Sequence, residues 1–207
     1  MKCFCGTLME ELNINNVFYY NCKNCGYLRK NNNLTKEMEK ERYDLHVCDE
    51  GYHKYMEDVF NKIRPYVFGR CLDSGCGKIH LLSDILNDNG FNSSYYDLYY
   101  YNQKIEGLFD TIILIEVFEH ILDVYELMKY LKSLLDKDGK IIIMTKKKQY
   151  PLDKFWYLRD ITHVSFVDDK TMEMLAKLLE MKLKIEDDFY VFIWFFILSK
   201  KESFFHF

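Results

Sequence analysis

The chain has 207 residues, of which 49% are hydrophobic, and a formal net charge of −4 at pH 7. This length supports one hydrophobic core with a small appendage. The acidic balance provides no general attraction for phosphate backbones, which disfavours nucleic acid as a partner. The longest apolar run, residues 191–198, is too short to cross a bilayer, so we expect no membrane segment.

The first thirty residues contain two cysteine pairs, Cys3 with Cys5 and Cys22 with Cys25. The segment between the pairs indicates two strands joined by an Asn-Asn turn. Two cysteine-bearing turns can hold one tetrahedral Zn²⁺, and a segment this short cannot stabilise itself by core burial alone. We therefore expect residues 1–30 to form a zinc-ribbon-like module with a structural Zn²⁺. The alternative is a loop of reduced thiols without metal.

The N-terminus also bears on location. The candidate zinc ligands begin at the third residue, which leaves no room for a signal peptide, and no cysteine spacing indicates disulfides. We therefore expect a cytoplasmic protein.

Two helices are expected next, one charged over residues 34–44 and one over 51–63 with apolar residues at three-and-four spacing. The predicted loop between the helices holds Tyr43 and His46. We assign residues 31–66 to a helical linker.

A short apolar strand then runs through Asp73 into a turn built on Gly75 and Gly77. Glycines let the backbone approach a ligand closely, and the helix expected from His80 offers unpaired N–H groups. Roughly 20 residues further on, the next predicted strand ends in Asp97, where a doubly wound fold places a carboxylate on ribose hydroxyls. The pattern predicts a nucleoside site.

Two further buried strands follow, over residues 109–115 and 140–145, with a helix between them. Strands that alternate with helices predict an α/β fold with a mostly parallel sheet. The first of these strands is followed by two carboxylates and an imidazole, Glu116, Glu119 and His120, at the sheet edge where open α/β folds keep their ligands. Only about a dozen residues separate Asp97 from the first strand, too few for a further helix, strand and loop.

The last third contains an irregular segment, residues 151–160, which we expect to line a substrate pocket and which leads to His163. The preceding lysine run, 146–148, is expected to be a solvated turn. A helix over 168–181 and an antiparallel hairpin with strands near 182–189 and 191–199 complete the sheet.

These residues resemble the class I S-adenosylmethionine-dependent methyltransferases, in the branch whose fourth strand ends in Glu-Val-x-Glu-His, here Glu116 to His120. The resemblance runs from about residue 42 to residue 200. A narrower resemblance, to a bacterial subgroup with a Cys-rich N-terminal module, lies in three stretches: Glu41-Arg42-Tyr43-Asp44-Leu45-His46, Asp49-Glu50-Gly51-Tyr52 and Arg159-Asp160-Ile161-Thr162-His163-Val164-Ser165-Phe166.

The resemblance implies a Rossmann-like sheet over residues 67–207 with S-adenosylmethionine as cofactor. It also implies that the segment around Tyr43 closes over the cofactor as a lid. The expected cofactor-binding residues are Asp73, Gly75, Gly77, Asp97, Glu116 and Tyr43.

We therefore expect a methyltransferase for a small-molecule or carrier-borne acceptor, with oxygen or carbon as the acceptor atom. His120 and His163 are the expected catalytic residues, since histidine can remove an acceptor proton near neutral pH. The alternatives are a zinc-ribbon RNA methyltransferase and a non-catalytic scaffold with the same fold. Nothing in the sequence defines the oligomeric state.

Overall fold

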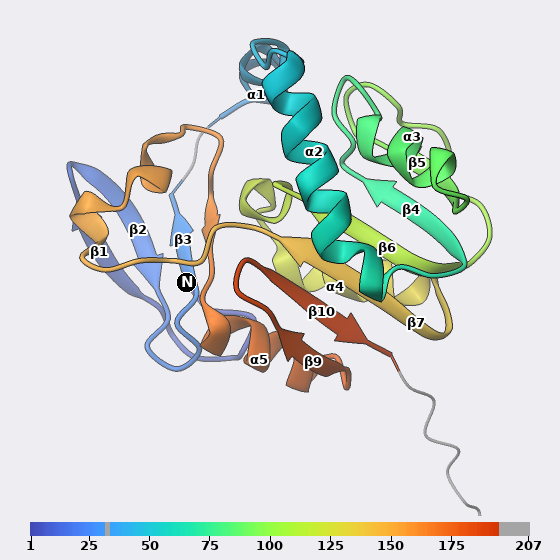
Figure 1. Ribbon diagram of the computed structural model, residues 1–207. Helices are drawn as coiled ribbons and strands as arrows, with labels where there is room; N and C mark the ends of the chain where they lie inside the picture. The colour runs from blue at the N-terminus through green and yellow to red at the C-terminus, as the bar shows by residue number, and fades with distance from the viewer. Residues whose placement is uncertain (32–33, 195–207) are drawn as a thin grey trace, which may run out of the picture.

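The computed structural model describes residues 1–31 and 34–194, and this part of the chain forms two sheets (Figure 1). The larger sheet has the strand order β5-β4-β6-β7-β10-β9. Its strands are β4 (Arg70–Ser74), β5 (Asn92–Tyr96), β6 (Phe109–Ile115), β7 (Leu135–Met144), β9 (Lys182–Ile185) and β10 (Phe189–Ile193).

The strands from β5 to β7 pair in parallel, whereas β10 is antiparallel to both β7 and β9. This topology confirms the predicted Rossmann-like, mostly parallel sheet with an antiparallel C-terminal hairpin. The hairpin is shorter than expected, because β9 ends at Ile185. Residues 195–199 of the predicted final strand lie outside the described residues.

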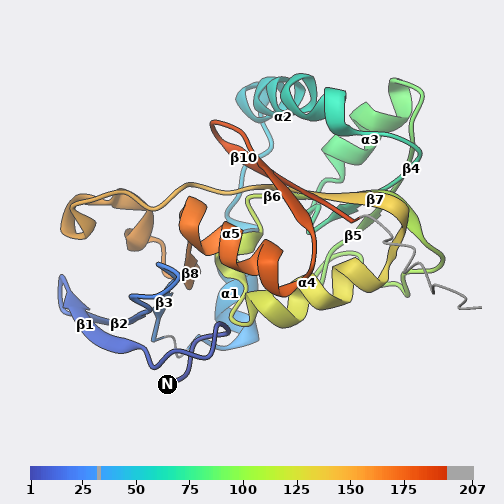
Figure 2. The ribbon, with the colours of Figure 1, turned by 90° about the horizontal axis from the view of Figure 1, so that it is seen from below.

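Helices cover both faces of the larger sheet (Figure 2). α2 (Glu50–Ile63) and α3 (Leu81–Asp88) cover one face, and α4 (Val124–Ser133) and α5 (Asp169–Leu178) cover the other. Alternate residues of β6 face the two layers: Ile113 packs in the core under α2 and α3, and Ile112 in the core over α4. β6 is therefore buried on both sides, which explains its continuous apolar sequence.

No strand forms between Asp97 and Phe109, all of which is described, so the prediction of a missing strand is confirmed. The chain instead makes a tight turn closed by an isolated antiparallel bridge between Asp97 and Tyr101. β5 is consequently the edge of the sheet on this side.

The smaller sheet has the order β1-β2-β3-β8, with β1 (Glu10–Ile14), β2 (Val17–Asn21), β3 (Leu28–Lys30) and β8 (Ser165–Phe166). The expected hairpin is confirmed: Asn15 and Asn16 join β1 to β2 with φ angles of 52° and 64°, values that asparagine tolerates well. Because β3 pairs with β8, the N-terminal cysteine segment shares a sheet with the segment that follows β7.

A small hydrophobic core strengthens this connection. Phe155, Tyr157 and Leu158 of the segment after β7 pack with Tyr19 and Leu28 of the N-terminal sheet. Within the same region the buried Lys30 ammonium donates to the carbonyl oxygens of Leu158 (3.1 Å) and Asp160 (2.7 Å). The segment after β7 is therefore folded against the N-terminal sheet.

The lysine run after β7 is not the solvated turn that we expected. Lys148 is buried, pairs with the carboxylate of Asp168 at 3.0 Å and donates to the carbonyl of Gly26. Lys147 pairs with Asp169 at 2.9 Å, and only Lys146 is exposed. The sequence contained no local sign of these contacts, because both aspartates lie about twenty residues further along the chain.

α1 (Lys36–Asp44) differs from the prediction in one respect that matters for the site. Tyr43 and Asp44 belong to its last turn and not to the loop that follows, whereas His46 is in that loop and exposed. α1 has no buried residue. Among the described helices, none is long and apolar enough to cross a membrane.

We predict that Lys148→Met destabilises the protein by about 2 kcal/mol, because the half-buried Asp168 carboxylate and the Gly26 carbonyl lose a charged donor. Denaturant unfolding measures the change. Lys146→Met is the matched control, since its side chain is exposed and its loss should leave stability within about 0.5 kcal/mol. Equal stabilities for the two variants would contradict a structural role for Lys148.

Candidate functional site

The glycine turn after β4 has the backbone that its sequence predicted. Gly75 and Gly77 have φ angles of 86° and 68°, which favour glycine. A Cβ on Gly75 would lie 2.5 Å from Val117, whereas no atom lies within 4 Å of a Cβ position on Gly77. The turn thus contacts the residue after β6 on one side and leaves open space on the other.

Asp97 lies beside this turn and accepts three backbone hydrogen bonds. One carboxylate oxygen accepts from Gly77 at 3.0 Å, and the other accepts from Tyr99 at 2.8 Å and Tyr100 at 3.2 Å. The side chain therefore connects the end of β5 to the glycine turn. Asp73 is buried deeper, at the end of β4, and burial raises its pKa to about 7.

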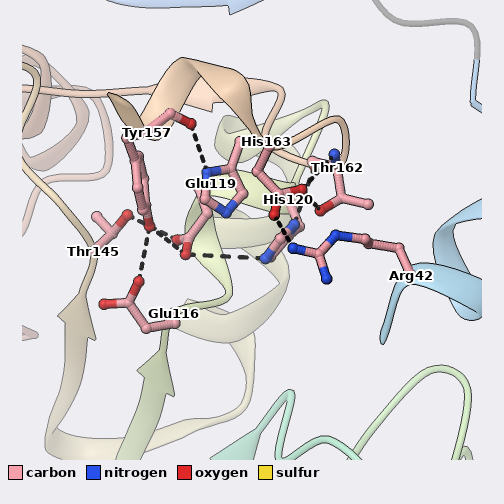
Figure 3. Close-up of polar contacts among 9 residues, drawn as sticks. Arg42, Glu116, Glu119, His120, Thr145, Tyr157, Thr162 and His163 are labelled. Atoms are coloured by element: carbon pink, nitrogen blue, oxygen red, sulfur yellow. Dashed lines mark hydrogen bonds and ion pairs between the residues drawn. The ribbon is translucent and has the colours of Figure 1, made fainter. Parts of the chain in front are cut away.

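Two glutamates follow β6, and Tyr157 joins them (Figure 3). The Tyr157 hydroxyl lies 2.9 Å from Glu116 and 2.5 Å from Glu119. Since a hydroxyl carries one proton, both contacts are hydrogen bonds only if one carboxyl is protonated. Burial raises the pKa of Glu119, and desolvation by the surrounding protein together with the Glu119 charge raises that of the more exposed Glu116 to about 7.

Glu119 is the centre of the network. It is 1% exposed, and its second carboxylate oxygen accepts from the Thr145 hydroxyl at 2.8 Å. Glu116 has a positive φ of 52°, an uncommon conformation for this residue type. The turn it starts carries Glu119 and His120 back toward the segment after β7 (Figure 3).

The two predicted catalytic histidines lie together, with ring centroids 4.9 Å apart. The Nδ1–H of His120 donates to the Thr162 carbonyl at 3.1 Å, and that of His163 donates to the Tyr157 carbonyl at 2.9 Å. Burial lowers the pKa of both imidazoles, to about 4 for His163. Both rings are therefore neutral near pH 7.

α1 contributes the outer wall of this cluster. The Tyr43 ring packs edge-on against His120, with centroids 5.2 Å apart, and against Tyr99 at 5.6 Å. The preceding residue of the helix, Arg42, pairs with Asp160 at 2.7 Å. Tyr43 therefore touches both the histidine cluster and the turn that follows Asp97.

The predicted residues fall into two groups along the carboxyl edge of the sheet. The first group consists of Gly75, Gly77 and Asp97, with Asp73 beneath it. The second group consists of Glu116, His120, His163 and Tyr43. Glu119 was expected at this edge but without an assigned role, and Thr145, Tyr157 and Asp160 were not predicted as site residues. Thr145 could have been found, because it follows a buried parallel strand as Glu116 does.

The four N-terminal cysteines also come together. The Sγ atoms of Cys3 and Cys25 are 3.5 Å apart, as are those of Cys5 and Cys22, and all four lie within 4.8 Å of one another. Three of the four are buried. Such a cluster suits tetrahedral coordination by thiolates.

Known structures share this architecture at low sequence identity. Magnesium protoporphyrin IX methyltransferase from Synechocystis PCC 6803 with bound SAH aligns with a TM-score of 0.54 and 15% identity, over 79% of this chain and 89% of that one. A SAM-dependent methyltransferase from Archaeoglobus fulgidus aligns with a TM-score of 0.52 and 15% identity, over 67% of this chain and 93% of that one.

No curated protein sequence matches the chain. The profile of the methyltransferase domain, however, matches residues 40–180, which include the glycine turn, the Glu116–His120 turn and His163. This match spans most of the chain, which therefore belongs to the methyltransferase-domain family.

Proposed function

We propose that the protein transfers a methyl group from S-adenosylmethionine to a small-molecule or carrier-borne acceptor. The observation that carries the proposal is the contact between Gly75 and Val117. Through it, the turn proposed to hold the nucleoside touches the turn that bears Glu116, Glu119 and His120. A cofactor and an acceptor bound at these two turns would be neighbours.

The residues at the first turn fit the cofactor. Gly77 leaves space for a ligand to approach the backbone. Asp97, fixed by three backbone donors, can accept from a ribose hydroxyl with its remaining lone pair. When bound, S-adenosylmethionine supplies a methyl group activated by a positively charged sulfur. The protein has to align the acceptor with that methyl group and exclude water.

We propose that α1 is the lid of this site. Its polar side chains contact the turn after β5 and the segment after β7: Glu39 accepts from the Tyr99 hydroxyl at 2.5 Å, and Arg42 pairs with Asp160 at 2.7 Å. Because α1 buries no apolar residue, polar and ring contacts hold it. Such contacts can be broken and remade at low cost when ligands enter.

We further propose that the cysteine cluster binds a structural Zn²⁺ and that residues 1–30 act as its module. The module would steady the segment after β7, since β3 pairs with β8. None of the seven cysteines forms a disulfide, as is usual in a reducing compartment, so we infer a cytoplasmic location.

The cofactor site can be tested with two glycine variants that differ only in place. Gly77 and Gly90 both have a positive φ and no atom within 4 Å of a Cβ position, so Ala should cost either about 1–2 kcal/mol of stability. We predict that Gly77→Ala lowers the affinity for S-adenosylhomocysteine at least tenfold, measured by calorimetry, because the new methyl enters the space proposed for the ligand. Gly90→Ala, at the far end of α3, should bind as wild type.

Wild-type protein that binds no S-adenosylhomocysteine would contradict the proposed function and favour a non-catalytic scaffold. Equal affinities for the two glycine variants would move the cofactor site elsewhere.

The zinc site predicts about one tightly held Zn²⁺ per chain after gel filtration in zinc-free buffer. Cys25→Ser should lose this ion, because one of four thiolates is removed, and should destabilise the N-terminal sheet. Elemental analysis measures the content. Cys48→Ser is the control, since Cys48 lies outside the cluster. Unchanged zinc in Cys25→Ser would rule out the cluster as the site.

We predict that the stability of the protein depends on pH through the Asp160 carboxylate. Burial alone would raise its pKa, but two hydrogen bonds from Thr162 and the charge of Arg42 lower it to about 2, against an ordinary value of about 3.9. The ionised carboxylate therefore stabilises the fold above about pH 4, by on the order of 2 kcal/mol, and this contribution disappears as the pH falls toward 2.

Asp160→Asn should accordingly lose less stability than wild type between about pH 5 and pH 3 in denaturant titrations. Asp88→Asn, on the exposed end of α3, serves as the control and should follow wild type. Parallel pH curves for Asp160→Asn and wild type would show that the carboxylate is not stabilised by its neighbours.

A further inference from the structure

Three side chains capable of binding a metal meet at the acceptor side of the site. The carboxylate of Glu119 and the ring nitrogens of His120 and His163 supply one ligand atom each, all within 4.8 Å of one another. The cluster lies far along the chain from the cysteines and contains no sulfur. It draws on two segments, the turn after β6 and the segment after β7 (Figure 3).

The histidines are oriented as metal ligands usually are. Each donates its Nδ1–H to a backbone carbonyl, His120 to Thr162 and His163 to Tyr157. A histidine that binds a metal through one ring nitrogen almost always donates such a hydrogen bond from the other, because the bond fixes the tautomer and the ring plane. It leaves a lone pair on each Nε2, and no hydrogen bond from the described residues reaches either atom.

Glu119 has the matching outer contacts. Tyr157 donates to one oxygen at 2.5 Å and Thr145 to the other at 2.8 Å, so the carboxylate is held while lone pairs remain. The first of these oxygens lies 4.0 Å from Nε2 of His120. Hydrogen bonds to a ligating carboxylate are as typical of metal sites as those to its histidines.

We propose that Glu119, His120 and His163 bind a divalent transition-metal ion, separate from the zinc at the cysteines. Two imidazoles and one carboxylate suit ions such as Mn²⁺, Fe²⁺, Co²⁺ or Zn²⁺. Ligand atoms about 2.1 Å from one ion lie about 3.0 to 3.4 Å apart, so the most widely separated pair has to close by up to about 1.8 Å. Buried charge also favours the ion, since a cation compensates the buried carboxylate.

The ion narrows the acceptor class, and this step rests on the proposed function. Three protein ligands leave coordination positions open, where an acceptor hydroxyl can bind and lose its proton to solvent at neutral pH. The resulting oxygen anion forms the new bond to the methyl carbon, and the pair of electrons of the broken carbon–sulfur bond stays on sulfur, giving the neutral thioether. Oxygen rather than carbon is then the acceptor atom.

The test uses Mn²⁺, whose preference for nitrogen and oxygen ligands keeps it from the cysteine site. Full-length protein is loaded with zinc, passed over chelating resin and titrated with Mn²⁺, and electron paramagnetic resonance reports the unbound ion. We expect about one Mn²⁺ per chain. Glu119→Gln, which keeps the shape of the side chain, and His163→Ala should each weaken binding more than tenfold while the zinc content stays the same.

Matched controls are Glu126→Gln and His53→Ala, both exposed and outside the cluster, which should bind Mn²⁺ as wild type does. Failure of wild type to bind Mn²⁺, or unchanged binding in Glu119→Gln and His163→Ala, would overturn the inference. These outcomes are independent of S-adenosylhomocysteine binding, so the metal site and the proposed function can fail separately. Once an acceptor is known, methylation that survives metal removal yet depends on the histidines would overturn the metal's role in favour of a general base.

Discussion

The candidate site depends on the pairing of β3 with β8. About twenty residues separate the end of β7 from β8, and ordering their backbone costs on the order of 20 kcal/mol. The N-terminal sheet offsets this cost with strand pairing, with the small core around Tyr19 and Leu28, and with the buried Lys30 ammonium. Without that sheet, the segment that carries Tyr157 and His163 would have little to fold against.

This dependence gives the cysteine cluster a role beyond its own segment. Cys25 is adjacent to Gly26, whose carbonyl accepts from Lys148, and two residues further on Leu28 pairs with Phe166 of β8. The Zn²⁺ proposed at the cysteines would therefore also fix the strand on which β8 forms. Because metal binding and folding are coupled in such small modules, loss of the ion should reach the histidine cluster through the backbone.

The sequence was informative where the signal is local. Gly75, Gly77 and the Asn15-Asn16 turn each need a positive φ, and glycine and asparagine are the residues that supply it. Glu116 and His120 follow a strand recognisable by its apolar run. Contacts between residues distant in sequence were not predicted. Examples are the ion pair of Lys148 with Asp168, the hydrogen bonds of Lys30 to two carbonyls beyond residue 157, and the pairing of β3 with a strand of two residues. No periodicity encodes such pairings.

Several features of the site lower the stability of the fold, and this indicates that they serve a function. Glu119, Thr145 and His163 are buried polar groups, and Glu116 holds an uncommon backbone conformation. Leucine or valine in these places would pack without hydrogen-bond partners, so stability alone does not call for them. Strain and buried charge of this kind are characteristic of functional sites.

The short connection after Asp97 completes the argument, because it links the two halves of the site. Where a further strand would have covered the edge of β5, the chain instead turns back and presents Tyr99 and Tyr100, whose hydroxyls donate to Glu39 and Asp44 of α1. The same helix carries Tyr43 against His120. The Asp97 turn and the wall of the histidine cluster are therefore both in contact with α1, so a displacement of the turn would be transmitted to that wall through α1. Binding at one group of site residues can thus affect binding at the other through α1, without a change in the sheet.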